Sequence, residues 1–313
     1  MDVSVILCTY NRGERLKKTL DSLAAQEALS GIDFEIIIVD NNSKDATKDV
    51  VSSYQPRFNG RLRYVFEPQQ GISKARNRGI KESYGEITVF TDDDVLLSPK
   101  WIREVYDFFR RHNDADAMGG QILPGYPPET PQWIKDNREL LSGPIVSHDY
   151  GPDDLIYNAQ MCPLVGANMA FRKAVFSRYG NFKTDLGAGA GTVGEDSELY
   201  KRICAGGAVV YYCGQASICH PVEADRMTLK YIAKWKISAA RGYVVLYGDE
   251  FDRKKFVYIF GVPRYLLREL LGRGISLIKN FTDRQKFLVA WINFFYTIGV
   301  ICEFRRRNQN AKS

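Results

Sequence analysis

The chain has 313 residues, of which 45% are hydrophobic and 26% are charged, and its formal net charge is +6. This composition excludes a disordered or collagen-like chain, and the length suits one large domain with an appendage. The six cysteines include no CxxC pair, which argues against a zinc site and favours reduced thiols over a disulfide framework. Because no charged and then apolar secretory segment precedes the first strand, we expect the protein in the cytosol.

The N-terminal part of the chain alternates apolar segments with amphipathic ones. Leu16, Leu20 and Leu23 keep helical spacing, and a second helix is expected at residues 73–83. Strands are predicted at residues 3–9, 34–40, 62–66 and 86–91. This βαβα order predicts the α/β class, with a mostly parallel, Rossmann-like sheet and flanking helices.

A Pro- and Gly-rich segment at residues 124–154 interrupts the pattern. A loop of this length is a lid, a binding segment or a simple insertion, and the sequence leaves these alternatives open. Further elements are expected as strands at 165–171, 208–212 and 217–219 and as helices near 173–178 and 196–205. We therefore expect a large α/β domain at residues 1–240 and a helical tail at 241–313.

The tail combines positive charge with apolar residues. Residues 226–313 contain 18 Lys and Arg against 6 Asp and Glu, whereas residues 1–225 contain 25 against 31. The uncharged stretch 287–302 has 16 residues, short of the roughly 18 to 20 that a spanning helix needs. We hypothesise that residues 254–307 form amphipathic helices on the inner face of the cell membrane. Core packing and homodimer contacts are the alternatives.

Three consecutive aspartates follow the predicted strand 86–91. Because side chains alternate along a strand, Asp92 and Asp94 should point to one side and Asp93 to the other. Two carboxylates about 4 Å apart repel by roughly 4 kcal/mol at an effective dielectric near 20, which favours proton uptake or a bound cation. Oxygen ligands suit Mg²⁺ or Mn²⁺. A solvated turn is the alternative, although ligands of open α/β sheets bind at such strand ends.

Other polar residues could complete a site around this cation. Asp40 ends the second strand, where it would bind a ribose or base, or cap the next helix. Arg76 lies among cations that would match a diphosphate or form a solvated face. Glu195 and Asp196 begin a helix, whose dipole would keep a base ionised, unless they only cap it. His220 is either structural or a metal or phosphate ligand.

These residues lie in short motifs whose order along the chain is informative. The motifs are Ile6-Leu7-Cys8-Thr9-Tyr10-Asn11-Arg12, Val39-Asp40-Asn41-Asn42-Ser43, Lys74-Ala75-Arg76-Asn77-Arg78-Gly79, Thr91-Asp92-Asp93-Asp94-Val95, Gly166-Ala167-Asn168-Met169-Ala170-Phe171, Gly194-Glu195-Asp196-Ser197-Glu198-Leu199 and His220-Pro221. Taken together, over roughly residues 3–240, they resemble the family 2 glycosyltransferases.

The resemblance implies a GT-A fold and a nucleoside-diphosphate-sugar donor, with a UDP-sugar as the first expectation. It implies that Thr9 and Asp40 hold the nucleoside, that Arg76 approaches the diphosphate, and that Gly166 and Asn168 line the donor or acceptor sugar. The motif members expected to complete the donor site are Tyr10, Arg12, Asn42, Asp93 and Glu195.

The resemblance also implies a divalent metal, Mn²⁺ or Mg²⁺, and inversion at the anomeric carbon. Asp94 would bind the metal, Asp92 would face the ribose or the metal's water shell, and His220 would be a further ligand. Asp196 falls where the family has its catalytic base. A carboxylate with an ordinary pKa of about 3.9 is ionised at neutral pH and can take the proton of an acceptor hydroxyl.

Processive members of the family carry a QxxRW motif, whereas this chain reads Tyr231-Ile232-Ala233-Lys234-Trp235 at that place. We therefore expect a non-processive enzyme that adds one sugar to a glycan or a lipid-linked acceptor in polysaccharide or glycolipid biosynthesis, without a nucleic-acid partner. A nucleotidyltransferase or another sugar-nucleotide-modifying enzyme would need more than the single glycine, Gly13, after the first strand. A non-catalytic nucleotide-sugar-binding protein would not need Asp92, Asp94 and Asp196 together.

Overall fold

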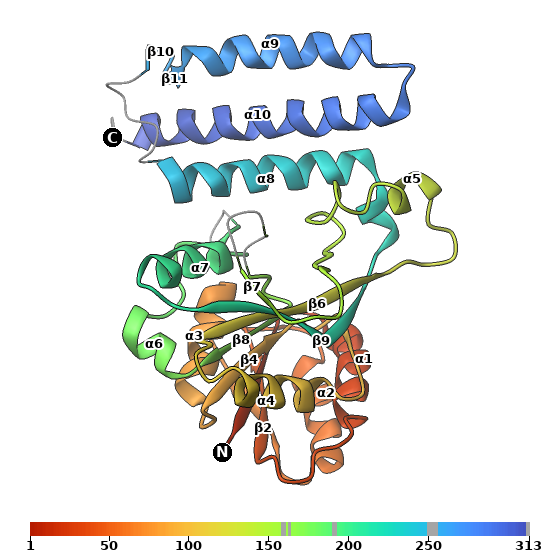
Figure 1. Ribbon diagram of the computed structural model, residues 1–313, viewed down its shortest axis with the longest axis vertical. Helices are drawn as coiled ribbons and strands as arrows, with labels where there is room; N and C mark the ends of the chain where they lie inside the picture. The colour runs from red at the N-terminus through yellow and green to blue at the C-terminus, as the bar shows by residue number, and fades with distance from the viewer. Residues whose placement is uncertain (158–160, 162–163, 190–192, 249–255, 311–313) are drawn as a thin grey trace. The chain divides into compact units, whose positions relative to one another are not determined.

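The computed structural model describes residues 1–157, 161, 164–189, 193–248 and 256–310 (Figure 1). The chain divides into two compact units. The first comprises Met1–Pro127, Val146–Ala190 and Glu195–Val222, and the second comprises Pro128–Ile145, Gly191–Gly194 and Glu223–Ser313. The boundary expected at residue 240 falls inside helix α8 (Leu229–Tyr247), which groups with the second unit.

The first unit is built on one mixed sheet with the strand order β3-β2-β1-β4-β8-β6-β9-β5, with β7 beside β9. Its strands are β1 (Val3–Thr9), β2 (Phe34–Asp40), β3 (Leu62–Phe66), β4 (Ile87–Thr91), β5 (Leu96–Leu97), β6 (Ala117–Gly125), β7 (Leu155–Ile156), β8 (Asn168–Arg172) and β9 (Val210–Pro221). The first four strands are parallel neighbours, whereas β8 is antiparallel to both β4 and β6. The predicted α/β class is therefore confirmed.

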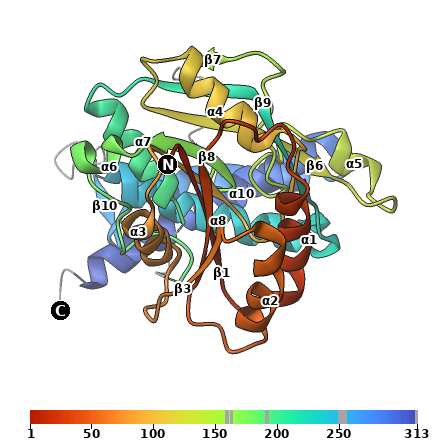
Figure 2. The same cartoon turned by 90° about the horizontal axis from the view of Figure 1, so that it is seen from below.

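Helices cover both faces of this sheet, because alternate strand residues point to opposite faces. Val3, Val5 and Leu7 of β1 pack with α1 (Gly13–Ala24), α2 (Thr47–Tyr54) and α4 (Trp101–Arg111). Ile6 lies in the other cluster, with α3 (Ile72–Glu82), α6 (Ala174–Tyr179) and α7 (Glu195–Ala205). Figure 2 shows α1 and α2 on one side of strands β1–β3 and α3 on the other. A short 3-10 helix, Gln55–Phe58, follows α2.

The parallel register brings three strand ends to one edge of the sheet. Thr9 at the end of β1 is paired with Asp40 at the end of β2. On the other side of β1, Leu7 is paired with Thr91, the last residue of β4. The aspartate triplet therefore begins beside the ends of β1 and β2.

Several elements differ from those expected. The strand expected at 165–171 begins at Asn168, and the two strands expected at 208–212 and 217–219 are parts of one strand, β9. Strand β6 had no clear signal, because Gly119 and Gly120 interrupt its apolar pattern. The long loop contains a short helix, α5 (Gln132–Lys135). Five cysteines are free thiols, and Cys162 lies outside the described residues.

The second unit consists mainly of three long helices. Helix α10 (Arg284–Asn310) packs between α8 and α9 (Arg264–Lys279), as Figure 1 shows. Their apolar contacts include Val244 of α8, Leu266 of α9 and Val300 of α10. The smaller elements are a 3-10 helix, Ala224–Met227, and a hairpin of β10 (Tyr258–Ile259) and β11 (Val262–Pro263).

The length of α10 changes one expectation about the tail. The segment Arg284–Asn308 has 25 residues, and an 18-residue window within it has a mean hydropathy of 1.7, so its length and composition suffice to cross a membrane. The uncharged stretch was too short, but the helix continues past both of its ends. Half of this window is buried by the rest of the protein, which is also typical of a core helix in a soluble protein.

Candidate active site

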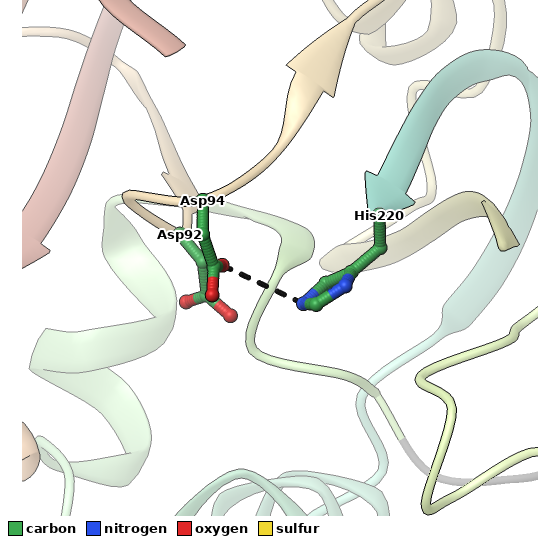
Figure 3. Close-up of side chains that lie close together, drawn as sticks. All are labelled: Asp92, Asp94 and His220. Atoms are coloured by element: carbon green, nitrogen blue, oxygen red, sulfur yellow. Dashed lines mark ion pairs between the residues drawn. The ribbon is translucent and has the colours of Figure 1, made fainter. Parts of the chain in front are cut away.

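The aspartate triplet forms a turn directly after β4. β4 is buried along its whole length between β1 and β8, so the position where it ends is fixed by both neighbours. In this turn the carboxylates of Asp92 and Asp94 lie beside the imidazole of His220 (Figure 3). One ligand atom from each of the three lies within 4.8 Å of the others, and Asp94 Oδ1 is 3.5 Å from His220 Nε2.

Strand pairing explains why His220 reaches the turn. The two-residue strand β5 follows the triplet at once and pairs antiparallel with β9, where Leu96 is opposite Cys219. The next residue of β9 is His220, which is buried, and its Nδ1 lies 3.1 Å from the carbonyl oxygen of Pro221. The pairing thus directs the other ring nitrogen, Nε2, toward Asp94.

The donor set of this cluster fits a divalent cation. Two carboxylates and one imidazole leave coordination positions for water or phosphate oxygens, which suits Mn²⁺ and Mg²⁺. Burial raises the pKa of Asp92 to about 7, Arg76 opposes this shift, and the charges of Asp94 and Asp93 add to it. Ionised Asp92 is therefore costly without a nearby cation, and a bound ion would offset that cost.

Asp93 points to the end of β1 and lies outside the metal-competent group. Its Oδ2 accepts a hydrogen bond of 2.7 Å from the hydroxyl of Thr9, and its Oδ1 accepts one of 2.9 Å from Arg12. The same Arg12 nitrogen lies 3.1 Å from Asp94 Oδ2. Asp93 therefore fixes the aspartate turn to the loop after β1, while Arg12 brings positive charge to both carboxylates.

Asp40 is buried at the end of β2, and both of its carboxylate oxygens have partners. Oδ1 accepts a hydrogen bond of 2.8 Å from the backbone N–H of Ser43, and Oδ2 accepts one of 2.7 Å from the hydroxyl of Tyr64. Asp40 does not cap the next helix, because the side chain bonded to the first residue of that helix, Thr47, is Asp45. Each oxygen keeps a second lone pair, so Asp40 can still accept from a ligand.

Arg76 occupies the buried side of the site, where it forms an ion pair with Glu195. Arg76 Nη1 and Glu195 Oε1 are 2.7 Å apart, and the side chains are 6% and 11% exposed. The guanidinium also lies over the ring of Phe182, with 5.4 Å between the guanidinium carbon and the ring centroid. Its electrostatic neighbours include both Asp92 and Asp196. Glu195 and Phe182 thus hold Arg76 within the protein, and its contact with the diphosphate stays a prediction.

Asp196 lies at the start of α7 and is held by backbone donors. Its Oδ2 accepts from the N–H of Gly166 at 3.1 Å and its Oδ1 from the N–H of Ser197 at 2.7 Å. Burial raises the pKa of Asp196 to about 6 and the charge of Glu195 adds to this, while Arg76 opposes it. A side chain at position 166 would collide with the Arg76 guanidinium, so any residue larger than glycine requires this buried arginine to shift.

Three other expected site residues, Tyr10, Asn42 and Asn168, differ in their exposure and in their hydrogen-bond partners. Tyr10 is 47% exposed next to Thr9. Asn42 has a left-handed backbone, with φ 66°, and accepts a hydrogen bond from Lys44. Asn168 is fully buried and bonds Trp101 through its oxygen and the carbonyls of 121 and 216 through its nitrogen. Asn168 is the strand partner of Thr91, directly before the aspartate turn, but its side chain is occupied by these three partners.

Two residues near the site were not singled out in the sequence. Tyr64 of β3 binds Asp40, and Asn41 links the end of β2 to the start of α3. Asn41 Oδ1 accepts from the N–H of Gly71 at 2.8 Å, and its Nδ2 donates to the carbonyl of Gln69 at 2.7 Å. A buried asparagine directly after a strand was the available signal for Asn41, whereas nothing local marked Tyr64.

Comparison with protein families gives a match to the model described as Glycosyl transferase family 2, over residues 4–180. The chain is 28% identical over 236 residues to the succinoglycan biosynthesis protein ExoM of Rhizobium meliloti, which covers 75% of this chain and 71% of that protein. It is 27% identical over 191 residues to a glucosyl-dolichyl phosphate glucuronosyltransferase of Haloferax volcanii. That match covers 60% of this chain and 58% of the relative, less than two thirds of its length.

A solved structure extends the comparison to the fold. The mannosyltransferase PcManGT of Pyrobaculum calidifontis, solved in complex with GDP-Man and Mn²⁺, matches with a TM-score of 0.61 at 19% identity. The match covers 96% of this chain and 86% of that chain. At this identity the likeness speaks for the fold alone, and it confirms the expected GT-A fold.

Proposed function

Because the chain belongs to glycosyl transferase family 2, and is therefore a glycosyltransferase, we propose that it moves one sugar from a nucleoside-diphosphate sugar to an acceptor hydroxyl, with inversion at the anomeric carbon. The family assignment confirms the resemblance seen in the motifs and sets aside the nucleotidyltransferase and the non-catalytic binding protein. One observation supports the proposal best. A metal-competent pair, Asp92 and Asp94, and a candidate base, Asp196, lie around the same buried arginine, Arg76.

Asp92, Asp94 and His220 would hold Mn²⁺ or Mg²⁺, and the ion would supply positive charge to the leaving diphosphate. Arg12 would add a second positive charge, since its guanidinium already lies within 3.1 Å of a carboxylate oxygen of both Asp93 and Asp94. Guanidinium groups match phosphate oxygens as well as carboxylates, so Arg12 can exchange one for the other when the donor binds.

Asp196 would act as the base that takes the proton of the acceptor hydroxyl. Its two backbone hydrogen bonds fix the carboxylate, so it need not reorganise during the reaction. A pKa of about 6 leaves the group ionised at neutral pH and basic enough to accept a proton. Arg76 and Glu195 would position this base from behind, while the diphosphate contact expected of Arg76 stays a prediction. A single in-line attack by the deprotonated hydroxyl then gives inversion.

The nucleoside would bind at the ends of β1 and β2. Asp40 offers free lone pairs to a ribose or base, and the nearby Thr9, Asp93 and exposed Tyr10 would complete the contacts with the nucleoside. Asn42 would border this part of the site, and Gly166 would line the sugar. We retain a UDP-sugar as the first donor to test, with GDP-mannose as the comparison.

For the acceptor, we propose a glycan or lipid-linked acceptor in polysaccharide or glycolipid biosynthesis. One relative is named for succinoglycan biosynthesis and another acts on glucosyl-dolichyl phosphate, as its name states. The basic, apolar tail supports peripheral attachment to the inner face of the cell membrane, where such an acceptor would be presented. Transfer of one sugar per encounter is expected, because the processive QxxRW motif is missing.

A thermal-shift screen tests the donor and the metal together. UDP-sugars and GDP-mannose are added to the protein with Mn²⁺, with Mg²⁺ or with EDTA, since a ligand that binds only the folded state raises the melting temperature. A donor at about 100 times its Kd should stabilise the protein by about 2.7 kcal/mol, and only with metal. Asp94→Ala should abolish the metal-dependent shift, whereas Asp107→Asn, on the surface of α4, should retain it.

Product analysis completes the test. The anomeric configuration of the transferred sugar, read by NMR, should be opposite to that of the donor. No shift with any nucleotide sugar, or equal shifts with and without metal, would contradict the proposed donor site, and retention of configuration would contradict the single in-line attack.

A further inference from the structure

Helix α9 of the second unit has apolar side chains on two opposite sides. Leu266 is buried against Val262 and Val300, and Leu270 packs against the same cluster. An amphipathic helix of a globular protein normally needs only one such stripe, with polar residues opposite. The side of α9 that turns away from this cluster therefore needs a separate explanation.

That side forms a continuous stripe, which we call the outer face of α9. Its apolar members Leu271, Ile275 and Ile278 are 71%, 53% and 79% exposed. Their spacing of four and three residues places them in one row along the helix. Phe281, just beyond the end of the helix, is 76% exposed and continues the row. In Figure 1, α9 lies outside α10 within the three-helix layer of α8, α10 and α9.

The charged residues of the outer face are all cationic. Arg264 and Arg268 precede the apolar row at the same helical spacing, and Lys279 lies beside its end; all three are exposed. The one acidic residue of the helix, Glu269, lies off this face and pairs with Arg273. Across residues 256–308 there are nine Lys and Arg against three Asp and Glu.

We propose that the outer face of α9 docks on the surface of an anionic lipid bilayer. The apolar row would enter the boundary between headgroups and acyl chains, and Arg264, Arg268 and Lys279 would meet lipid phosphates, as in interfacial amphipathic helices. At 1.5 Å per residue, the 16 residues of α9 give a contact about 24 Å long.

A bilayer fits this face better than a second copy of the chain. A two-fold interface sets the same face against itself, so every cation would meet apolar residues or another cation, with no carboxylate to neutralise it. An anionic bilayer supplies the missing negative charge. The docking is also peripheral, because α10, the helix long enough to span, is packed between α8 and α9.

The inference deepens the proposed membrane attachment by naming its surface, and it does not depend on the transfer chemistry. The full chain is sedimented with vesicles of phosphatidylcholine alone and with vesicles in which a quarter of the lipid is phosphatidylglycerol. Wild-type protein should bind the anionic vesicles roughly tenfold more strongly than the neutral ones, and added salt should weaken this binding. The double variant Ile275→Glu, Ile278→Glu should lose roughly tenfold or more on anionic vesicles.

A second variant separates the contribution of the cations from that of the apolar row, and a matched control tests whether the effect is specific to this face. Arg264→Gln with Arg268→Gln should lower binding to anionic vesicles and leave the weak neutral binding unchanged. Ile156→Glu replaces a comparably exposed isoleucine, 59% exposed, on strand β7 of the first unit and should bind like wild type. All these positions are on the surface, so the melting temperatures should stay within about 2 °C of wild type.

The experiments distinguish docking on a bilayer surface from a spanning helix and from a dimer interface. Equal binding by wild type and the double glutamate variant overturns the inference, and so does protein that stays in the membrane after high salt and carbonate, since that marks a spanning helix. If wild type is a dimer in sedimentation equilibrium, the double glutamate variant is a monomer and neither protein binds vesicles, the outer face of α9 is assigned to a second copy instead. The metal-dependent donor shift is measured on the same variants without vesicles: its absence in every variant would count against the proposed function and leave the docking result intact.

Discussion

Replacing Asp92 with asparagine is expected to stabilise the metal-free protein at alkaline pH, although it should weaken metal binding at the proposed site. Burial raises the pKa of Asp92 from 3.8 to about 7. A carboxylate with a raised pKa in the folded state contributes stability that is complete below the unfolded pKa and is lost as the pH rises through the folded one. At about pH 8 the group is ionised and its burial is a net cost. Asparagine resembles the protonated form and avoids that cost.

The magnitude follows from the size of the shift. Three pKa units at 1.36 kcal/mol each give an upper value of about 4 kcal/mol. Because Asp92 keeps some contact with solvent, we expect about half of this, about 2 kcal/mol at pH 8. For a unit of this size that corresponds to a rise in melting temperature of about 4 to 8 °C. At about pH 4.5 the gain should shrink to roughly a quarter, because Asp92 is then mostly protonated in the folded wild-type protein.

The assay is calorimetry or thermal shift in EDTA at both pH values, for wild type, Asp92→Asn and the control Asp107→Asn. The control changes an exposed carboxylate and should alter the free energy of unfolding by less than about 0.5 kcal/mol. Added Mn²⁺ should stabilise wild type and leave Asp92→Asn unchanged. A melting temperature of Asp92→Asn equal to or below that of wild type at pH 8 in EDTA would refute the reasoning that this carboxylate is strained without a cation.

Other predictions concern the base and the residues around it. Asp196→Asn should lower kcat by about a hundredfold or more while the donor Kd measured by calorimetry stays within about twofold; unchanged turnover would remove it as the base. The kcat of wild type should fall as the pH decreases through about 6, since protonated Asp196 cannot accept a proton; a flat profile down to about pH 5 would contradict this. Gly166→Ala should push against the Arg76 guanidinium and lower kcat by roughly tenfold at a nearly unchanged donor Kd. Full activity would show that the close contact between Gly166 and Arg76 is not needed for turnover. Glu195→Gln leaves Arg76 buried without its charged partner and should lower the free energy of unfolding, measured by chemical denaturation, by about 3 kcal/mol. Glu14→Gln, in an exposed pair with a lysine, should lower it by less than about 1 kcal/mol. Equal losses in the two variants would contradict the argument from burial.

The sequence alone predicted much of the N-terminal half of the sheet. Strands β1, β2 and β3 have the bounds expected from the sequence. β1 and β2 are buried along almost all of their length, and strands covered on both faces must be apolar, whereas β3 lies at the edge of the sheet and is only partly buried. β6 and β9 were missed or divided, since glycines and polar residues break their pattern although long-range pairing holds them. Local periodicity carries no information about such pairing, and this is also why the antiparallel direction of β8 was not foreseen, although a strand was expected there.

In the candidate site too, the sequence predicted the placement of neighbouring residues but not the contacts between residues far apart in the chain. The spacing of Asp92 and Asp94 after a strand was enough to predict two carboxylates at one strand end, because strand geometry is local. The meeting of His220 with Asp94 depends on the pairing of β5 with β9, which the sequence does not announce. The same holds for Arg76 and Glu195, which lie 119 residues apart in the sequence.

The sequence by itself thus determined the α/β class, the order of the first strands and the chemistry available at their ends. The tertiary structure decided which of those groups meet: it paired buried Arg76 with Glu195, bonded the side chain of Asn168 to Trp101 and brought His220 to the aspartates. The physical reason is that backbone geometry fixes where neighbouring side chains point. Contacts between distant segments depend instead on strand pairing and helix packing across the whole unit, which no single stretch of sequence specifies.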